Sequence, residues 1–340
     1  MNLFLYVALA VVLGGLGTSF VFSGWVRLIT SPKFTFDDIP DLSGKVAIVT
    51  GANTGIGKVS ARELARKGAH VIVACRSTPK GIATVNEITR EIPKANVEYM
   101  NLDLSSMANV QKFTDVYLAK GLGIDILMLN AGIMMNPFEL TEDKLESQFA
   151  TNHIGHFLMV QNLLPVLVQS KARVVSVSSL AHTFVSGIDF NTIHDENSYD
   201  KVKAYGVSKL SNVLFASELA RRYGAVGVTS YSVHPGLVAT ELMRHVDADF
   251  FKLGGHDGFA AKVYTWVKDS FNNALALDPN GGALTQLFVA TAPSNVIEQY
   301  NGAYYSPIAL RIDPSAVARD EVLAKKLYDY SLGIVKPFLH

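Results

Sequence analysis

The sequence predicts an α/β fold, built as a single doubly wound parallel sheet behind an N-terminal transmembrane helix. Three observations support this prediction. Residues 1–26 contain no Asp, Glu, Lys, Arg or His. Beyond residue 44, short apolar runs alternate with helical patterns, as expected for strand–helix–strand units. A glycine-rich loop directly follows the first of these apolar runs.

The composition bounds the architecture and excludes some functions. The chain has 340 residues, 49% of them hydrophobic, enough for one large domain or two modest ones. Lys plus Arg and Asp plus Glu both number 30, so no basic field attracts nucleic acid, and we expect no nucleic-acid partner. Cys75 is the single cysteine, which excludes an intramolecular disulfide and is compatible with a reducing compartment.

Residues 1–30 are predicted to be a membrane anchor. As a helix, the uncharged segment would span roughly 39 Å at about 1.5 Å per residue, against a hydrocarbon core of about 30 Å. Trp25, Arg27 and Lys33 then supply an aromatic and basic flank of the kind found on the cytoplasmic side. We therefore expect a single-pass anchor with the remaining chain in the cytosol, on the endoplasmic reticulum if the organism is eukaryotic.

Two other interpretations of this segment remain open. A cleaved signal peptide, which would give a luminal protein, usually has a basic start and an apolar core of about 7 to 15 residues, and neither is present. A buried core helix is disfavoured because Gly14, Gly15 and Gly17 lower helix propensity in water but are common in membrane spans. The chain also has no Asn-x-Ser/Thr sequon, in agreement with a domain outside a glycosylating lumen.

The remainder divides into a linker and one domain. Residues 31–43, with two prolines and an acidic pair, are predicted to be a polar linker. Residues 44–340 are predicted to form one domain, since they contain no repeat and no second linker. Most of the apolar runs are continuous rather than alternating, which is typical of parallel strands buried on both faces. The predicted strands are 46–50, 71–75, 97–102, 126–130, 173–178 and 228–233.

The glycine-rich loop, TGANTGIG at 50–57, has the context of a dinucleotide-binding site. It lies between the first strand and a helical pattern that stops at Gly68. Glycines are needed in such a loop because backbone amides must approach a pyrophosphate closely at the positive end of a helix. A Rossmann-type domain that binds a nicotinamide dinucleotide is therefore predicted.

The end of the second strand favours NADP(H) as the cofactor. An NAD enzyme places an Asp or Glu there to bind the ribose 2′-hydroxyl. This chain has no acid between Glu63 and Glu87 and instead places Arg76 directly after the strand. An arginine can pair bidentately with a 2′-phosphate. An ordinary solvated charge at the strand end is the alternative interpretation of Arg76.

Tyr205 and Lys209 form a candidate proton-transfer pair. They stand four residues apart in a helical pattern and therefore share one face. To exchange a proton near neutrality, a phenol of pKa about 10 should drop by a few units. An ammonium about 4 Å away supplies about 4 kcal/mol at an effective dielectric of 20, which is sufficient. Ser178 and Ser179 end the strand that precedes this helix, where ligands of open α/β sheets bind.

These motifs together resemble the short-chain dehydrogenase/reductase family, over nearly the whole of residues 44–310. The loop has the family's Gly-x-x-x-Gly-x-Gly spacing. Asn130-Ala131-Gly132 is similar to the family's NAG element, Asp103 to its acid near adenine, and His234-Pro235-Gly236 with Thr240 to the loop around nicotinamide. The resemblance implies the following cofactor-binding residues: Gly51, Asn53, Thr54, Gly55, Ile56, Gly57, Arg76, Asp103, Asn130, Ala131, Gly132, Tyr205, Lys209, Pro235, Gly236 and Thr240.

The same resemblance implies a catalytic tetrad of Asn152, Ser179, Tyr205 and Lys209. In the family the serine hydrogen-bonds the reacting oxygen, and the asparagine holds a water in a proton relay through the lysine. Ser178 remains open as the alternative to Ser179. An intact tetrad argues against the rival function, a membrane-anchored cofactor-binding scaffold without turnover.

Four segments narrow the resemblance to the retinol dehydrogenase branch, which includes the WW-domain oxidoreductases. They are ANTGIG, the Ala-Cys-Arg after the second strand, NHIGHF at 152–157 and SSLAH at 178–182. This branch implies alcohol–carbonyl interconversion on a lipophilic substrate such as a retinoid, a steroid or an aliphatic aldehyde or ketone. A membrane anchor would suit such a substrate, because a bilayer concentrates apolar molecules.

Residues 243–276 are predicted to be a substrate lid. Apolar side chains recur there at helical spacing, which suits a cap over a lipophilic pocket, a helix at the membrane surface or ordinary core packing. We expect no metal site, since hydride transfer to nicotinamide needs none. The histidines at 153, 156, 182 and 234 also fit no common ligand spacing. A homodimer is a candidate assembly that the sequence does not decide.

Overall fold

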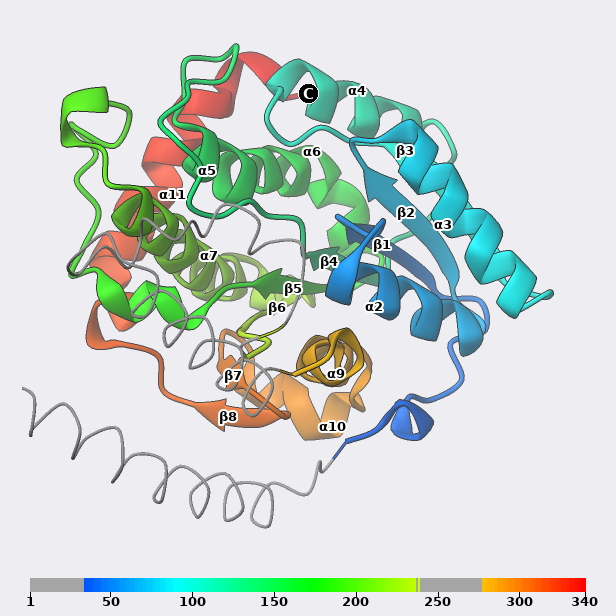
Figure 1. Ribbon diagram of the computed structural model, residues 1–340. Helices are drawn as coiled ribbons and strands as arrows, with labels where there is room; N and C mark the ends of the chain where they lie inside the picture. The colour runs from blue at the N-terminus through cyan, green and yellow to red at the C-terminus, as the bar shows by residue number, and fades with distance from the viewer. Residues whose placement is uncertain (1–33, 237, 239–276) are drawn as a thin grey trace, which may run out of the picture.

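One eight-stranded sheet, with helices on both faces, organises the chain (Figure 1). The computed structural model describes residues 34–236, 238 and 277–340. The strand order is β3-β2-β1-β4-β5-β6-β7-β8, and every neighbouring pair is parallel except the last. The order reverses between β1 and β4, which is where open α/β sheets bind ligands. The predicted doubly wound α/β fold is confirmed.

All six predicted strands are present, with their ends shifted by no more than one residue. The two additional strands, β7 and β8, were not predicted because each has only three residues and β8 is exposed. The strands are β1 (Val46–Thr50), β2 (His70–Cys75), β3 (Asn96–Asn101), β4 (Ile126–Leu129), β5 (Arg173–Val177), β6 (Thr229–Val233), β7 (Tyr304–Ser306) and β8 (Leu310–Ile312).

Helices cover each face of the sheet as a separate layer (Figure 1). One layer contains α2 (Gly55–Arg66), α3 (Thr78–Glu91) and α9 (Pro279–Thr291). The other contains α4 (Met107–Leu118), α6 (Gly155–Gln169), α7 (Lys201–Tyr223) and α11 (Glu321–Val335). The shorter helices are α5 (Ser147–Phe149), the π-helix η2 (Ala150–Ile154), α10 (Ser294–Ile297) and the 3₁₀ turns η1 (Phe36–Asp38), η3 (Leu180–Phe184), η4 (Glu196–Ser198), η5 (Gly224–Val226), η8 (Glu298–Tyr300), η9 (Ala316–Arg319) and η10 (Lys336–Phe338).

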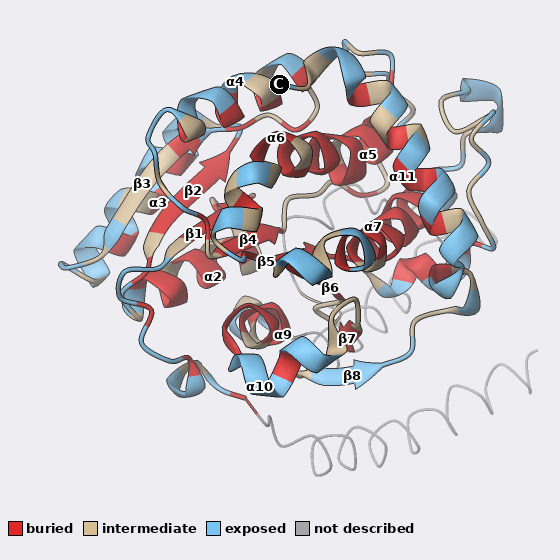
Figure 2. Ribbon diagram, turned by 180° about the vertical axis from the view of Figure 1, so that it is seen from behind, coloured by how far each residue is buried: buried red, intermediate tan, exposed pale blue. Residues whose placement is uncertain are grey.

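The central strands of the sheet are buried on both faces, which explains why most of them are continuously apolar. Along β1, Ile48 packs into the core on the side of α4, α6 and α7, while Ala47 and Val49 pack into the core beneath α2 and α9. Buried residues accordingly line the sheet and the inward sides of the helices, and exposed residues lie outside (Figure 2). A strand with apolar residues in both cores has no solvent face, so the two-residue alternation is absent.

The predicted linker differs from expectation over its described part. Phe34, Ile39 and Leu42 are buried in the core beneath α2 and α9, and the ring of Phe34 lies edge-on to Phe288 at 5.4 Å. The acidic pair in this stretch suggested a polar linker, but three apolar side chains spaced between the polar ones dock it onto the domain. Residues 34–42 are therefore part of the domain.

Three predicted features lie outside the described residues: the anchor at 1–30, the lid at 243–276 and Thr240. Within residues 34–236, 238 and 277–340, no helix combines the length and apolar character that crossing a bilayer requires.

Candidate active site

A cleft of about 1010 Å³ opens at the carboxyl ends of the central strands. Its wall includes residues that directly follow β1, β2, β4 and β5, on both sides of the reversal in strand order. Of the residues predicted from sequence, the cleft brings together Gly51, Asn53, Thr54, Gly55, Ile56, Gly57, Arg76, Asp103, Asn130, Ala131, Gly132, Ser179, Tyr205, Lys209, Pro235 and Gly236. Asn152 lies behind this wall rather than in it.

The glycine loop lines the cleft. At two of its positions a side chain would collide with neighbouring atoms. Gly51 has φ +65, and a Cβ there would lie 2.8 Å from the Cα of Ala131. A Cβ on Gly57 would lie 2.4 Å from Nδ2 of Asn130. Helix α2 begins at Gly55, so its first amides have no intrahelical partner and carry the positive end of the helix dipole. This arrangement suits a pyrophosphate.

A buried polar network fixes the strand ends beneath this loop. The hydroxyl oxygen of Thr50 accepts hydrogen bonds from the backbone amides of Asn130 and Ala131, both at 2.9 Å. The ring of His156 bridges this hydroxyl, 2.9 Å from Nε2, and the carbonyl of Asn152, 3.1 Å from Nδ1. Burial lowers the pKa of His156 to about 4, so the ring is neutral and links β1 to the π-helix. Both residues lie in the sequence motifs named above, but those motifs assigned no structural role to either.

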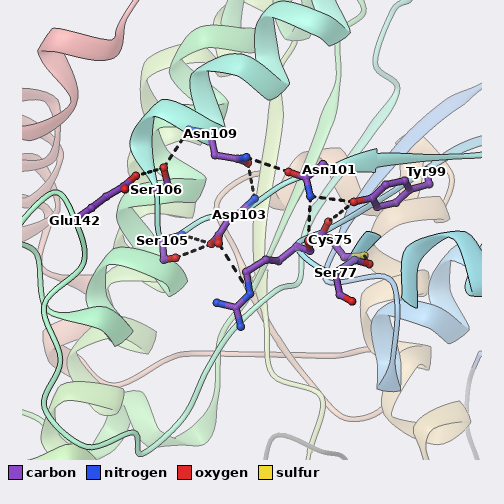
Figure 3. A network of polar contacts seen from close by, with 10 residues as sticks. Cys75, Ser77, Tyr99, Asn101, Asp103, Ser105, Ser106, Asn109 and Glu142 are labelled. Carbon is purple, nitrogen blue, oxygen red and sulfur yellow. Dashed lines mark hydrogen bonds and ion pairs between the residues drawn. The ribbon is translucent and has the colours of Figure 1, made fainter. Parts of the chain in front are cut away.

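Arg76, which directly follows β2, lines a further part of the cleft. Its side chain is 69% exposed, and its Nε lies 4.0 Å from Oδ2 of Asp103. Asp103 also accepts hydrogen bonds from the amide of Ser105 at 3.0 Å and from its hydroxyl at 2.6 Å. These contacts are part of the network drawn in Figure 3. A guanidinium at this rim can pair with an added phosphate, in competition with Asp103.

Two asparagines connect the loops that carry these charges (Figure 3). Asn101 donates a hydrogen bond from its side-chain amide to the carbonyl of Arg76 at 3.0 Å. Asn109 donates to Oδ1 of Asn101 at 3.0 Å and accepts from the amide of Asp103 at 2.6 Å. The backbone positions of Arg76 and Asp103 are thereby held relative to one another. Neither asparagine belongs to a motif, so the sequence gave no signal for them.

Tyr205 and Lys209 lie on the same face of α7, as the spacing predicted. The helix begins after Asp200, whose carboxylate accepts from the amides of Val202 and Lys203. The Lys209 ammonium lies 5.7 Å from the centre of the Tyr205 ring and donates to the carbonyl of Val177 at 2.9 Å. Both side chains are buried, with exposed fractions of 4% for Tyr205 and 3% for Lys209.

The proton affinities of this pair differ from expectation. Burial raises the pKa of Tyr205 to about 12, although its hydrogen bond with Ser179 acts in the opposite direction. Burial also lowers the pKa of Lys209 to about 8. The expected drop in the phenol pKa is therefore absent, because the loss of water around the phenolate outweighs the hydrogen bond with Ser179. At neutral pH the site presents a protonated phenol, the form that can donate a proton.

The geometry distinguishes the two candidate serines. Ser178 is buried and donates its hydroxyl hydrogen to the carbonyl of Lys209 at 2.7 Å. Ser179 is partly exposed at the cleft and hydrogen-bonds the phenol of Tyr205. A substrate oxygen that reaches the phenol would therefore meet Ser179 rather than Ser178.

Asn152 engages both amide donors of its side chain within the protein. Its Oδ1 accepts from the amide of Ile133 at 2.8 Å, and its Nδ2 donates to the carbonyl of Ile133 and to Ser208, both at 2.9 Å. An amide group has two N–H donors, and both are occupied. Its main-chain carbonyl faces the ring of His156 at 3.1 Å. Any water held by Asn152 would therefore bind to an acceptor oxygen rather than to a side-chain N–H.

The described part of the chain contains no group of three or more His, Cys, Asp and Glu side chains arranged to hold a metal ion. The residues that line the cleft offer hydroxyl, amide, phenol, ammonium, guanidinium and carboxylate groups, together with the glycines of two loops. This set suits a phosphorylated dinucleotide and acid–base chemistry at one end.

Comparisons with known proteins agree with this geometry. A family model described as short chain dehydrogenase matches residues 45–250. The short-chain dehydrogenase TIC 32 A, chloroplastic, of Brassica napus is 39% identical over 306 residues, covering 87% of this chain and 90% of that protein. Retinol dehydrogenase 11 of Homo sapiens is 40% identical over 295 residues, covering 86% of each.

A solved 3-oxoacyl (acyl-carrier-protein) reductase from Agrobacterium tumefaciens, with NADP bound, matches with a TM-score of 0.60 and 25% identity. The match covers 78% of this chain and 94% of that one. The range matched by the family model includes the glycine loop, the serine pair, Tyr205 and Lys209.

Proposed function

This chain belongs to the short-chain dehydrogenase family, in its retinol dehydrogenase-like branch, and we propose that it interconverts an alcohol and a carbonyl on a lipophilic substrate with NADP(H). The observation that carries the proposal is that one cleft is lined both by Ser179, Tyr205 and Lys209 and by the glycine loop. A dinucleotide laid along this cleft would bring its reactive ring to the phenol.

In the proposed reduction, Ser179 and Tyr205 hydrogen-bond the substrate carbonyl oxygen and fix its position. NADPH, when bound, supplies the hydride to the carbonyl carbon. Tyr205 transfers its phenolic proton to the oxygen, and the Lys209 ammonium stabilises the phenolate that results. The raised pKa of the phenol keeps the proton in place until charge develops on the oxygen. We propose that Asn152 holds a water that returns the proton through Lys209.

Several features support NADP(H) over NAD(H). Arg76 stands at the rim of the cleft where the adenosine ribose would lie, and Lys80 lines the same wall. No acidic residue ends β2, so a 2′-phosphate would meet a positive charge there. The NADP-bound reductase described above is a neighbour in fold and sequence.

The surroundings of Tyr205 support a lipophilic substrate. The ring lies in a small apolar cluster with Met134 and Ala181, and Met135 packs against it. The relatives named as retinol dehydrogenases act, by their names, on a lipophilic alcohol. We propose that residues 1–30 anchor the protein in a membrane, with residues 34–340 as a cytosolic domain and residues 243–276 as its lid. We also propose that it forms a homodimer.

The experiment that tests this function is a substrate screen with the full-length chain in detergent. Retinal, a ketosteroid and a medium-chain aldehyde are each offered with NADPH and, separately, with NADH. We expect oxidation of NADPH by at least one of them, at a higher kcat/KM than with NADH. Binding of NADPH without turnover on any substrate would contradict the proposal and favour a membrane-anchored scaffold.

A further inference from the structure

Met135 adopts a backbone conformation that residues other than glycine rarely adopt. Its φ is +55, in the left-handed region, although it has a full side chain. It lies in the loop that follows β4, three residues after Gly132, the last residue of the Asn130-Ala131-Gly132 segment of the cleft. Such outliers persist only where the surrounding structure holds them, and they concentrate at functional sites.

Gln148 on α5 holds this conformation. Its side chain is fully buried, and its Oε1 accepts a hydrogen bond from the amide of Met135 at 2.7 Å. Its Nε2 donates to the hydroxyl of Tyr199 at 2.8 Å and to the carbonyl of Lys201 at 3.1 Å. The amide is therefore fully engaged, with one group committed to the loop and two to the segment that leads into α7.

Tyr199 completes the clamp from the other side. Its hydroxyl, which accepts from Gln148, donates to the carbonyl of Asn136 at 2.6 Å. The amide of Met135 itself and the carbonyl of the next residue, Asn136, are thus both tied to buried or partly buried partners. Without these bonds, a methionine would relax toward the extended or right-handed helical region, and the loop would turn with it.

The clamped loop supplies the apolar surface beside the reactive phenol. Met134 is buried against Tyr205 and Ala181 and also lines the cleft, and Met135 packs on the same cluster. The unbranched thioether chains of methionine fit irregular apolar shapes. A change in the backbone at Met135 would move Met134 away from the phenol, which would alter the space next to the reacting oxygen.

We propose that Gln148 is a positioning residue that sets substrate selectivity, and this inference rests on the proposed function. By holding Met135 in the left-handed conformation, it keeps Met134 as an apolar wall against the Tyr205 phenol. The site therefore selects carbonyl compounds that carry a bulky apolar group next to the carbonyl. Gln148 itself does not line the cleft.

The first test is Gln148→Leu in the full-length chain, which keeps the side-chain volume and removes all three hydrogen bonds. KM and kcat are measured at saturating NADPH for a bulky apolar aldehyde and for a small aldehyde such as propanal. We expect KM for the bulky substrate to rise about tenfold. KM for NADPH and kcat/KM for propanal should remain unchanged. Gln161→Leu on α6, where the glutamine accepts from Tyr328, is the matched control and should change neither substrate.

The second test is rescue by Met135→Gly, since glycine adopts φ +55 without a steric penalty. The KM of Gln148→Leu/Met135→Gly for the bulky substrate should equal that of Met135→Gly alone. A purely structural role of Gln148 would leave the double variant worse than Met135→Gly by the full effect of Gln148→Leu. Should Gln148→Leu not fold, Tyr199→Phe carries the test, because it removes the bonds to Asn136 and Gln148 while retaining the ring.

Each outcome decides the inference. The inference is overturned, while the proposed function stands, if Gln148→Leu leaves the ratio of kcat/KM between the bulky substrate and propanal unchanged. It is also overturned if Met135→Gly gives no rescue. Wild-type protein that binds NADPH but turns over neither substrate removes the proposed function, and the inference with it. A selective rise in KM for the bulky substrate, reversed by the glycine, supports both.

Discussion

Replacement of Arg76 by Ser should weaken the use of NADPH and leave the use of NADH nearly unchanged. The guanidinium at the rim of the cleft is the charged group that we propose pairs with the 2′-phosphate. NADH has a hydroxyl at this position, which gains little from a cation. Loss of Arg76 therefore removes a contact that only one of the two cofactors makes.

The size of the effect follows from the surroundings of Arg76. A hydrogen bond to a charged group contributes about 1.5 to 3 kcal/mol. The side chain is 69% exposed and has Asp103 as a competing partner 4.0 Å away, so solvent screening places the contribution at the lower end. About 1.5 kcal/mol corresponds to about a tenfold rise in KM for NADPH.

The assay is steady-state kinetics with one carbonyl substrate, with NADPH or NADH varied. Arg90→Ser is the control, because this arginine lies in the last turn of α3 and does not line the cleft. Equal changes in KM for NADPH and NADH would refute the reasoning. So would an unchanged KM for NADPH, which would leave Arg76 as a solvated charge at the end of β2.

Two further predictions concern stability. Gly57→Ala should lower the free energy of unfolding by about 1 to 3 kcal/mol, because the new Cβ would lie 2.4 Å from Nδ2 of Asn130. Gly333→Ala is the control and should not lower it, since nothing lies within 4 Å of a Cβ at that position. Equal denaturation midpoints for the two variants would contradict the packing argument. Burial lowers the pKa of His153 to about 3, so between about pH 6.5 and pH 3 the unfolded chain binds a proton that the folded chain does not, and stability falls as the pH falls. Between pH 6.5 and pH 5, the free energy of unfolding of His153→Phe, measured in urea, should therefore fall by about 2 kcal/mol less than that of the wild type. Equal falls in the two proteins would exclude His153 as a source of this acid sensitivity.

Local sequence patterns predicted the central part of the fold well. Five of the six long strands are buried along nearly their whole length, and most of these are continuous apolar runs that stand out from their neighbours. The glycine loop and the Tyr205–Lys209 pair have fixed spacings set by a tight turn and by one helical turn. These features depend on neighbours in sequence, and the predicted cleft residues accordingly lie together.

Features set by burial or by distant contacts could not be predicted in the same way. The pKa of Tyr205 is raised rather than lowered because the phenol is buried, and burial is not visible in a motif. The clamp on Met135 joins residues 13 apart and depends on a backbone angle. The stretch from Phe34 to Leu42 looked polar because of its acids, but its three apolar side chains dock it onto the core.

The most direct test of the central claim, that Tyr205 donates the proton at this site, is the turnover of Tyr205→Phe. The full-length variant is assayed with NADPH and the best substrate of the screen, alongside NADPH binding and thermal unfolding. We predict loss of turnover of at least about a hundredfold, the lower range for general acid catalysis, with NADPH binding and folding retained. Turnover equal to that of wild type would contradict the account.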